Sequence, residues 1–407
     1  MSQQAKHQIL IIGGGAAGIT VASQLFAVQN NLDIAIIEPS DKHYYQPAWT
    51  LVGGGAYSAE ATAKTEKAVI PDGVTWIQDY CDRFIPESNQ VVTRSQQTIT
   101  YDYLVVCPGI QIDWQKIPGL TEALGKNGVC SNYAYEQAPQ TWSTIQNFSG
   151  GTAIFTYPNT PIKCAGAPQK IMYLADEAFR KQGVRDQAKI LYCTATPGIF
   201  GVAAYAKPLM EIVNRKDIQL KAKHNLKAID GESKKAIFDV TTDSGTEEVT
   251  IKYDMIHVTP PMSSPDFIKN SPLANDAGWV DVDKYTLQHN KYANVFSLGD
   301  ASSLPTSKTA AAVRAEAPVL VENLLATMQE QNLNATYDGY ACCPLVTGYG
   351  KVMLAEFDYD KNPSPSFPLD PTKERYSMWL LKKYGLPYLY WNRMLAGKPF
   401  ERNLLKK

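Results

Sequence analysis

The 407-residue chain lacks the cysteine patterns that mark the common structural metal sites. Its seven cysteines include no CxxC pair, and no group of cysteines and histidines has zinc-site spacing, so we predict no metal site. The segment from Met1 to His7 resembles neither a secretory signal nor an Arg-rich transit peptide. We therefore expect no disulfide scaffold, and we expect a bacterial protein or a mature organellar form.

Long apolar runs and an excess of one charge are also missing. No apolar run reaches the roughly 18 residues that a membrane-spanning helix needs. The net charge of −1 indicates no polyanionic partner, so we predict no nucleic-acid binding. The composition is that of a globular protein, with 44% hydrophobic and 19% charged residues. At about 150 residues per domain, this length predicts roughly two to three domains.

A glycine-rich turn near the N-terminus indicates a dinucleotide site. A predicted strand, His7 to Ile12, leads into the turn, and a predicted helix follows through Val28. The turn is Gly13-Gly14-Gly15-Ala16-Ala17-Gly18. Gly13 permits the tight turn, Gly15 lets the backbone approach a pyrophosphate, and Gly18 allows close packing of helix on strand. The helix N-terminus then favours the phosphate charge.

The next strand strengthens this interpretation. Asp33 to Ile37 is a predicted strand, and Glu38 follows Gly18 by 20 residues, where an acid can bond ribose hydroxyls. The succession of strand, glycines, helix, strand and acid therefore predicts a bound dinucleotide. A glycine-rich turn in an unrelated α/β fold is the alternative.

Two later segments favour FAD over other dinucleotides. Tyr101 to Gly109 is a predicted strand that ends in a glycine turn, and Asn294 to Asp300 is another that ends in an acid. Both resemble motifs of the two-dinucleotide flavoprotein disulfide reductase-like superfamily, in which the acid binds the ribityl chain. Asp300 would have that role here. Alternatively, Asp300 only caps a helix that begins near Thr309.

The second Rossmann-like region lacks the corresponding fingerprint. Gln187 to Cys193 is a predicted strand, but the following turn keeps only Gly198 and Gly201, and Pro197 removes an N–H donor. We infer that this region has lost nicotinamide binding. The loss argues against an NADH dehydrogenase, although variant pyrophosphate loops exist.

Several longer segments resemble the sulfide:quinone oxidoreductase family, most closely its mitochondrial-type branch, and the similarity covers essentially the whole chain. The most specific segments are His43–Pro47, Pro158–Lys170, His257–Met262, Pro305–Val313 and Cys343–Tyr349. The resemblance implies FAD as cofactor and Cys164 and Cys343 as a redox pair, bridged directly or through an extra sulfur. Hydrosulfide would attack the bridge, leaving Cys343 as the persulfide carrier and Cys164 as the thiolate that faces the flavin.

The same resemblance names the other reactants and, together with the glycine-rich motif, the cofactor residues. Persulfide sulfur would pass to glutathione, sulfite or sulfide, and electrons would pass through FAD to a quinone of the ubiquinone or plastoquinone type. The residues assigned to the cofactor are Gly13, Gly15, Ala16, Ala17, Gly18, Glu38, Gln46, Cys81, Gly109, Asp300 and Lys308. Cys81 would contribute only its backbone, near the adenine, and Lys308 a cation near the flavin. Beside Cys164, Lys163 would favour the thiolate by its charge.

The remaining cysteines are interpreted as structural, with one ambiguity. Cys107 and Cys193 are expected to be inert buried thiols. Cys342 should point away from its neighbour Cys343, so that just one of them faces the flavin. Cys130 remains open, because other branches of the family use a third cysteine in a similar place. His43 is expected to be structural and to lie near the flavin.

From Tyr376 onward the sequence becomes apolar, aromatic and basic. Met378–Leu381 and Leu386–Trp391 are apolar, and lysines and arginines flank them. Gly385 and Pro387 are expected to break the stretch into two short helices. Aromatic residues with flanking cations are typical of an interfacial membrane anchor. A helix pair that packs in the core or forms a dimer is the alternative.

We therefore expect an α/β fold with two Rossmann-like dinucleotide-binding domains and a C-terminal amphipathic membrane-docking segment. The expected divisions are 1–110 with 280–335 for FAD, 111–279 for the second domain with Cys164, and 336–407 for the C-terminal segment with Cys343. We expect a peripheral protein of the bacterial cytoplasmic membrane or an equivalent membrane, and a homodimer is possible. The alternative functions are a type II NADH:quinone oxidoreductase and a non-catalytic flavin-binding module.

Overall fold

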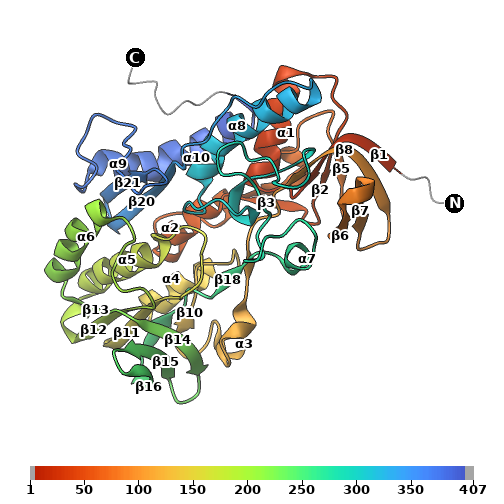
Figure 1. Cartoon of the computed structure of the whole chain (residues 1–407). Helices are drawn as coiled ribbons and strands as arrows, with labels where there is room; N and C mark the ends of the chain where they lie inside the picture. The colour runs from red at the N-terminus through yellow and green to blue at the C-terminus, as the bar shows by residue number, and fades with distance from the viewer. Residues whose placement is uncertain (1–4, 399–407) are drawn as a thin grey trace.

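The computed structural model describes residues 5–398 and contains a mixed, mainly parallel β-sheet and a fully parallel one, with helices packed on them (Figure 1). The first sheet begins with β1 (Ala5–Ile12) and β2 (Ile34–Ile37), whose aliphatic residues are buried as parallel strands require. Helix α1 (Ala16–Val28) connects these two strands. The other strands are β5 (Thr75–Ile77), β6 (Cys81–Ile85), β7 (Gln90–Thr93), β8 (Thr98–Val106) and β19 (Val295–Ser297).

The strand order brings three turns to one edge of this sheet. The order is β5-β2-β1-β8-β7-β6, and β19 pairs with β8. The last residues of three strands lie in register, because Ile12 pairs with Val106 and Val106 pairs with Ser297. The turns that follow these residues are therefore neighbours at the carboxyl ends of the strands, where open α/β sheets bind ligands.

The second sheet is formed by the middle of the chain, drawn in yellow to green in Figure 1. Its order is β10-β17-β11-β12-β13, and all neighbours are parallel. The strands are β10 (Val129–Cys130), β11 (Gly151–Tyr157), β12 (Ala188–Thr194), β13 (Ile218–Lys221) and β17 (Met255–His257). The helices that follow in this region are α4 (Ala138–Gln146), α5 (Ala167–Gln182) and α6 (Ala203–Arg215). An antiparallel three-stranded sheet adjoins them, made of β14 (His224–Asp230), β15 (Lys235–Thr242) and β16 (Gly245–Lys252).

Two short strand pairs and several short helices complete the parts around the two sheets. The strand pairs are β3 (Lys42–Tyr44) with β4 (Ala63–Thr65), and β9 (Gln111–Ile112) with β18 (Met262–Ser263). The short helices are α2 (Trp49–Gly53), α3 (Leu120–Ala123) and α7 (Asp266–Lys269). The expected α/β fold with two Rossmann-like sheets is confirmed, whereas the residue limits of the domains stay a prediction.

Helix α8 (Ala310–Met328) leads from the first sheet to a β-hairpin. The Thr309 hydroxyl caps this helix by accepting a hydrogen bond from the Ala312 amide at 3.1 Å, so Asp300 is not its cap. The hairpin consists of β20 (Ala341–Gly348) and β21 (Lys351–Phe357), and β20 packs along α5 and against α8. In Figure 1 it is drawn in blue at the left, above α5 and α6.

The C-terminal segment forms one continuous helical run, which corrects the expectation of two helices separated at Gly385 and Pro387. The run passes through α9 (Tyr376–Leu380), a π-helical turn (Leu381–Gly385), α10 (Leu386–Leu389) and a second π-helical turn (Tyr390–Met394). Pro387 lies in α10, directly after the first π-helical turn. Between residues 5 and 398, no helix is both long and apolar enough to cross a bilayer.

Candidate active site

A cavity of about 800 Å3 extends from the glycine-rich turn to the C-terminal helical run. It contains most residues that the sequence assigned to a cofactor. Those lining it are Gly15, Ala16, Ala17, Glu38, Gln46, Gly109, Asp300 and Lys308, together with Cys164. Among the described residues assigned to the cofactor, Gly13, Gly18 and Cys81 lie outside this lining.

The backbone of the glycine-rich turn is shaped for close approach. Gly13 has φ of +105°, and a Cβ there would collide with the backbone of Cys107, so the turn and its neighbour are in tight contact. Gly15, in contrast, faces open space at the start of α1. This cradle in front of a helix N-terminus fits the pyrophosphate of a dinucleotide.

Two buried carboxylates stand beside this turn. Glu38 Oε2 accepts the Gly14 amide at 2.8 Å, and burial raises the pKa of the Glu38 carboxyl. Glu66, which the sequence did not indicate, also lines the cavity, and its buried Oε1 has no hydrogen-bond partner within residues 5–398. An unsatisfied buried acceptor requires a donor, and ribose hydroxyls would provide one. The residues present therefore fit a dinucleotide.

Cys164 lies where the cavity meets the second sheet. Its backbone is left-handed, with φ of 58°, an uncommon conformation for a residue other than glycine. The Cys164 amide donates to the Lys308 carbonyl at 2.8 Å, which ties this loop to the segment before α8. A strained backbone of this kind persists only where surrounding contacts hold it in place. Such residues are often found at functional sites.

The structure brings Cys164 and Cys343 together, although they are far apart in the chain. The two thiols share a hydrogen bond, and Lys170 Nζ donates to Cys164 Sγ at 3.1 Å. The Cys343 hydrogen bond, with the charge of Lys170, holds the pKa of Cys164 well below its ordinary value, although burial opposes this shift. The hydrogen bond to Cys164 and burial raise the pKa of Cys343. Both shifts favour the thiolate at Cys164 over the thiolate at Cys343.

The cation beside Cys164 differs from the one that the sequence predicted. Lys163 points the other way: its Nζ donates to Gln46 Oε1 at 2.7 Å and lies 5.0 Å from the centre of the Trp49 ring. Lys170 takes its place because the first turns of α5 carry its side chain back to the sulfur. A sequence neighbour in a loop need not face the same way, whereas a helix fixes which residues do.

A second buried lysine close to the sulfur pair was also missed. Lys382 lies in the first π-helical turn, 3% exposed, and its Nζ donates to the Pro47 carbonyl at 2.8 Å. Burial lowers the pKa of Lys382 to about 7, and the neighbouring charge of Lys170 acts in the same direction. Burial likewise lowers the pKa of Lys308 to about 8.

The adjacent cysteines of β20 point to opposite sides, as alternation in a strand predicts. Cys342 lines the cavity, whereas Cys343 faces α5 and Cys164. Cys130 does not line the cavity; its thiol donates to the Ile256 carbonyl at 3.6 Å inside the second sheet, and burial raises its pKa to about 12.

His43 links the C-terminal run to the glycine-rich turn. Its Nδ1 lies 3.0 Å from the Gly14 carbonyl, and its Nε2 lies 2.6 Å from the Tyr390 hydroxyl. With 2% exposure it is fully enclosed. Both ring nitrogens are used in these contacts, which agrees with the expected structural role beside the cavity.

The turn after β12 is closed by its own side chains. The hydroxyls of Thr194 and Thr196 lie 2.7 Å apart, and Thr196 donates to the Gly198 carbonyl at 2.7 Å. No residue of this turn lines the cavity described above. Its hydroxyls are thus engaged with each other and with the turn backbone.

Comparison with known proteins places the chain in a family. Residues 7–143 match the family model described as "Pyridine nucleotide-disulphide oxidoreductase". The chain is 49% identical to the mitochondrial sulfide:quinone oxidoreductase of Mus musculus, over 96% of this chain and 87% of that protein. It is also 49% identical to the mitochondrial enzyme of Dictyostelium discoideum, over 98% and 88%.

A solved structure has the same fold over nearly its whole length. The sulfide:quinone oxidoreductase of Aquifex aeolicus superposes with a TM-score of 0.80 at 21% identity, covering 96% of this chain and 92% of that one. By its 49% identity to the two mitochondrial enzymes over nearly its whole length, the chain belongs to the sulfide:quinone oxidoreductase family.

Proposed function

We propose that this chain oxidises sulfide and reduces a quinone with FAD, and that Cys164 and Cys343 form its redox pair. The observation that carries the proposal is the hydrogen-bonded sulfur pair, of which Cys164 lines a cavity that begins on a dinucleotide turn. Such a site would place the two reactive sulfurs beside a cofactor that accepts two electrons.

Different residues that line the cavity would bind different parts of FAD. Gly15, Ala16 and Ala17 would hold the pyrophosphate at the N-terminus of α1. Glu38 and Glu66 would accept hydrogen bonds from ribose hydroxyls. Asp300 would bond the ribityl chain. When bound, FAD supplies the acceptor for one electron pair at a time.

The sulfur pair performs the first step when it is bridged. Hydrosulfide attacks the sulfur of Cys343, the bond between the sulfurs breaks, and the electron pair of that bond leaves on Cys164 as a thiolate. Cys343 then carries the new sulfur as a persulfide. A small nucleophile, which we propose to be glutathione, sulfite or a second hydrosulfide, removes the outer sulfur and leaves Cys343 as a thiolate.

Two buried lysines support this step. Lys170 stabilises the leaving thiolate through its hydrogen bond to Cys164. Lys382, also near the pair, adds positive charge while protonated. Together they would attract the hydrosulfide anion to the pair.

The quinone would enter the cavity beneath the C-terminal run. The apolar residues that line the cavity include Cys342, Leu354, Phe367, Leu386, Leu389 and Met394. Such an apolar wall fits a ring with an isoprenoid tail of the ubiquinone or plastoquinone type. Arg314 also lines the cavity, and a guanidinium is a group that can donate to a quinone oxygen.

The outer face of the same run supports docking to a membrane. Tyr376, Leu380, Tyr384 and Tyr388 recur every fourth residue and are 64%, 41%, 60% and 63% exposed. In a regular α-helix, residues spaced by four drift gradually around the axis. The two π-helical turns have more residues per turn and counteract this drift, so the four side chains stay on one face. Exposed tyrosines beside cations such as Lys383 fit a bilayer interface. We propose a peripheral attachment, to the bacterial cytoplasmic membrane or an equivalent one.

The test is an anaerobic titration of the FAD-loaded protein. We expect stoichiometric sulfide to bleach the flavin absorbance and to produce a long-wavelength charge-transfer band, and a short-chain quinone to restore the oxidised spectrum. NADH should leave the flavin oxidised. Bleaching by NADH but not by sulfide would contradict the proposal and favour a type II NADH:quinone oxidoreductase. Bound FAD that responds to neither would favour a non-catalytic module.

A further inference from the structure

The helix and the strand that carry the two cysteines run side by side. Helix α5 begins three residues after Cys164, and β20 packs along it. At the sulfur end, Gly166 is so close to β20 that an added Cβ would meet the side chains of Leu345 and Cys343. At the far end, a Cβ on Gly348 would meet the carboxylate of Glu177.

The distance between these two contacts is the same along the helix and along the strand. From Gly166 to Glu177 the helix rises about 16 Å, at 1.5 Å per residue. From Cys343 to Gly348 the strand extends about 16 Å, at roughly 3.3 Å per residue. A slip of the strand at its far end would therefore be transmitted to Cys343, because neither element stretches.

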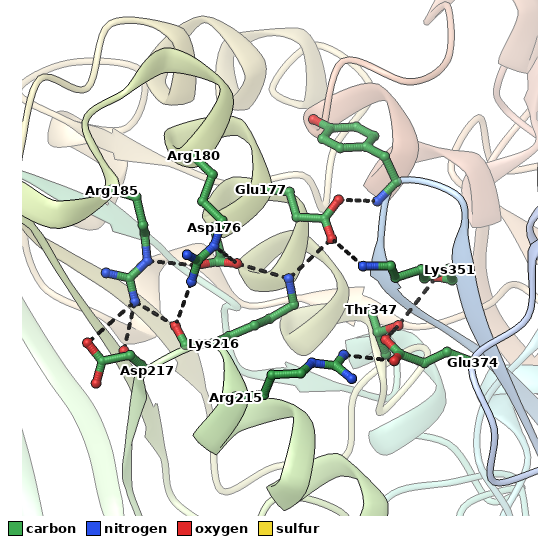
Figure 2. Close-up of polar contacts among 11 residues, drawn as sticks. Asp176, Glu177, Arg180, Arg185, Arg215, Lys216, Asp217, Thr347, Lys351 and Glu374 are labelled. Carbon is green, nitrogen blue, oxygen red and sulfur yellow. Dashed lines mark hydrogen bonds and ion pairs between the residues drawn. The ribbon is translucent and has the colours of Figure 1, made fainter.

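Glu177 holds the far end through the hairpin turn (Figure 2). Its Oε2 accepts the Tyr349 amide at 2.8 Å, and its Oε1 lies 3.5 Å from Lys351 Nζ and 3.3 Å from Lys216 Nζ. Tyr349 is fixed further, because its hydroxyl donates to the Gly54 carbonyl at 2.6 Å. One carboxylate thus joins α5, the residue that follows α6 and the hairpin turn.

The preceding residue, Asp176, makes a different set of contacts (Figure 2). It is fully buried and pairs with Arg185 at 2.7 Å, Lys216 at 2.9 Å and Arg180 at 3.1 Å. These partners lie on α5 itself and in the segments after α5 and α6, whereas the hairpin supplies none of these three. Asp176 and Glu177 therefore share a network but differ in whether they pair with the element that carries Cys343.

We propose that Glu177 is a positioning residue for the sulfur pair: it holds the turn of β20 and β21 in register with α5 and so sets the separation of Cys164 and Cys343. The chemical importance of that separation rests on the proposed function. The left-handed backbone of Cys164 is consistent with a sulfur whose place is determined from several sides.

The separation matters because a disulfide has narrow geometric limits. When the two thiols form an S–S bond, they lose two protons and two electrons. In a redox titration the electrons and protons pass to the disulfide of an oxidised dithiol reagent, which becomes the dithiol. Any strain from a displaced β20 weakens the S–S bond and shifts this equilibrium toward the thiols.

The test measures that equilibrium in the FAD-loaded protein. The protein is equilibrated with reduced and oxidised dithiothreitol, and alkylation with mass spectrometry gives the oxidised fraction of the pair. For Glu177→Ala we expect the equilibrium constant for disulfide formation to fall about tenfold, which is about 30 mV for a two-electron couple. Glu177→Gln should fall less, because its amide oxygen still accepts the Tyr349 N–H. Lys351→Gln should shift slightly in the same direction.

The matched control is Asp176→Asn, which removes a charge one residue away and breaks buried ion pairs. We expect it to lower the melting temperature at least as much as Glu177→Ala while leaving the disulfide equilibrium within about twofold of wild type. Unchanged equilibria in the Glu177 variants, or an equal shift in Asp176→Asn, would overturn the positioning role. This measurement does not depend on sulfide turnover. A wild-type protein that does not react with sulfide would refute the proposed function, and the disulfide equilibria of the variants would still test the positioning role.

Discussion

Two regions of this chain place buried cysteines in contrasting surroundings. Cys130 and Cys193 lie in strands of the second sheet, and burial raises the pKa of each to about 12. Cys164 lies on a left-handed loop residue, where a hydrogen bond from Cys343 and the charge of Lys170 lower its pKa. Burial alone keeps a thiol protonated and inert, whereas burial beside a donor and a cation produces a thiolate.

The comparison also separates two neighbouring positions on one strand. Cys342 lines the cavity, as Leu354 and Phe367 do, and burial raises its pKa well above the ordinary value. Cys343 faces Cys164 on the other side of β20. Reactivity here depends on which face of the strand a residue occupies, and a shift of one residue would remove the pair.

The largest expected effect comes from removing one member of the pair. Cys343→Ser should lower sulfide-dependent quinone reduction by at least roughly 1,000-fold, since the proposed persulfide carrier is removed. Cys130→Ser is the matched control and should keep activity within about twofold. Steady-state assays with sulfide and a short-chain quinone measure both. A strong loss in Cys130→Ser would give that thiol the catalytic role that the sequence left open.

The second prediction removes the cation that distinguishes the two regions. Lys170→Gln should raise the pKa of Cys164, because the thiolate loses a charge-assisted hydrogen bond worth about 1.5–3 kcal/mol, or roughly one to two pH units. The pH dependence of the alkylation of Cys164 measures this shift, and we expect its midpoint to move to higher pH. Lys163→Gln should leave the alkylation midpoint unchanged. An equal shift in both variants would show that overall charge, not the contact, controls the thiol.

The third prediction concerns the exposed face of the C-terminal run. The double variant Tyr384→Glu with Tyr388→Glu should weaken binding to vesicles of anionic lipid about tenfold, since the apolar contact is lost and like charge is added. Flotation assays measure the bound fraction. Tyr80→Glu, at a position that is 49% exposed on another part of the protein, is the control and should bind as wild type does. Unchanged binding of the double variant would place the membrane contact elsewhere.

The smallest expected effect is on stability. The pKa of Lys382 is about 7 in the folded protein, against 10.5 for an ordinary lysine, so the unfolded chain binds more protons between these values. The contribution of Lys382 to stability therefore rises with pH over that window. Lys382→Met should raise the melting temperature by a few degrees near pH 7 and should flatten its rise with pH. A steeper rise in the variant would contradict the buried cation.

The sequence was sufficient for features that are local or carried by long family segments. The strand, glycine turn, helix and acid from His7 to Glu38 follow from periodicity and spacing, and the α/β fold is confirmed. The structure also brings Cys164 and Cys343 together, as the family resemblance implied. Their assigned roles stay proposals, as do those of the individual cofactor residues.

The sequence was insufficient where side-chain direction or distant packing decides. Lys170 replaced Lys163 because α5 returns its side chain to the sulfur, which needs the helix start to be known. In the sequence, Lys382 resembled the other surface cations around the C-terminal run. In the structure its side chain is buried on the inner side of the run, and its Nζ donates to the Pro47 carbonyl. The π-helical turns kept this run continuous across Gly385. No local pattern predicts these contacts, since their partners are hundreds of residues away or depend on the exact turn.

The most direct test of the central comparison is the pH profile of alkylation for each cysteine of the FAD-loaded, fully reduced wild-type protein, followed peptide by peptide with mass spectrometry. We predict that Cys164 reacts with a midpoint well below that of an ordinary thiol, while Cys130 and Cys193 stay unmodified until the protein unfolds. A Cys164 that stays protonated to the same pH as the others would contradict the division of the cysteines into two regions.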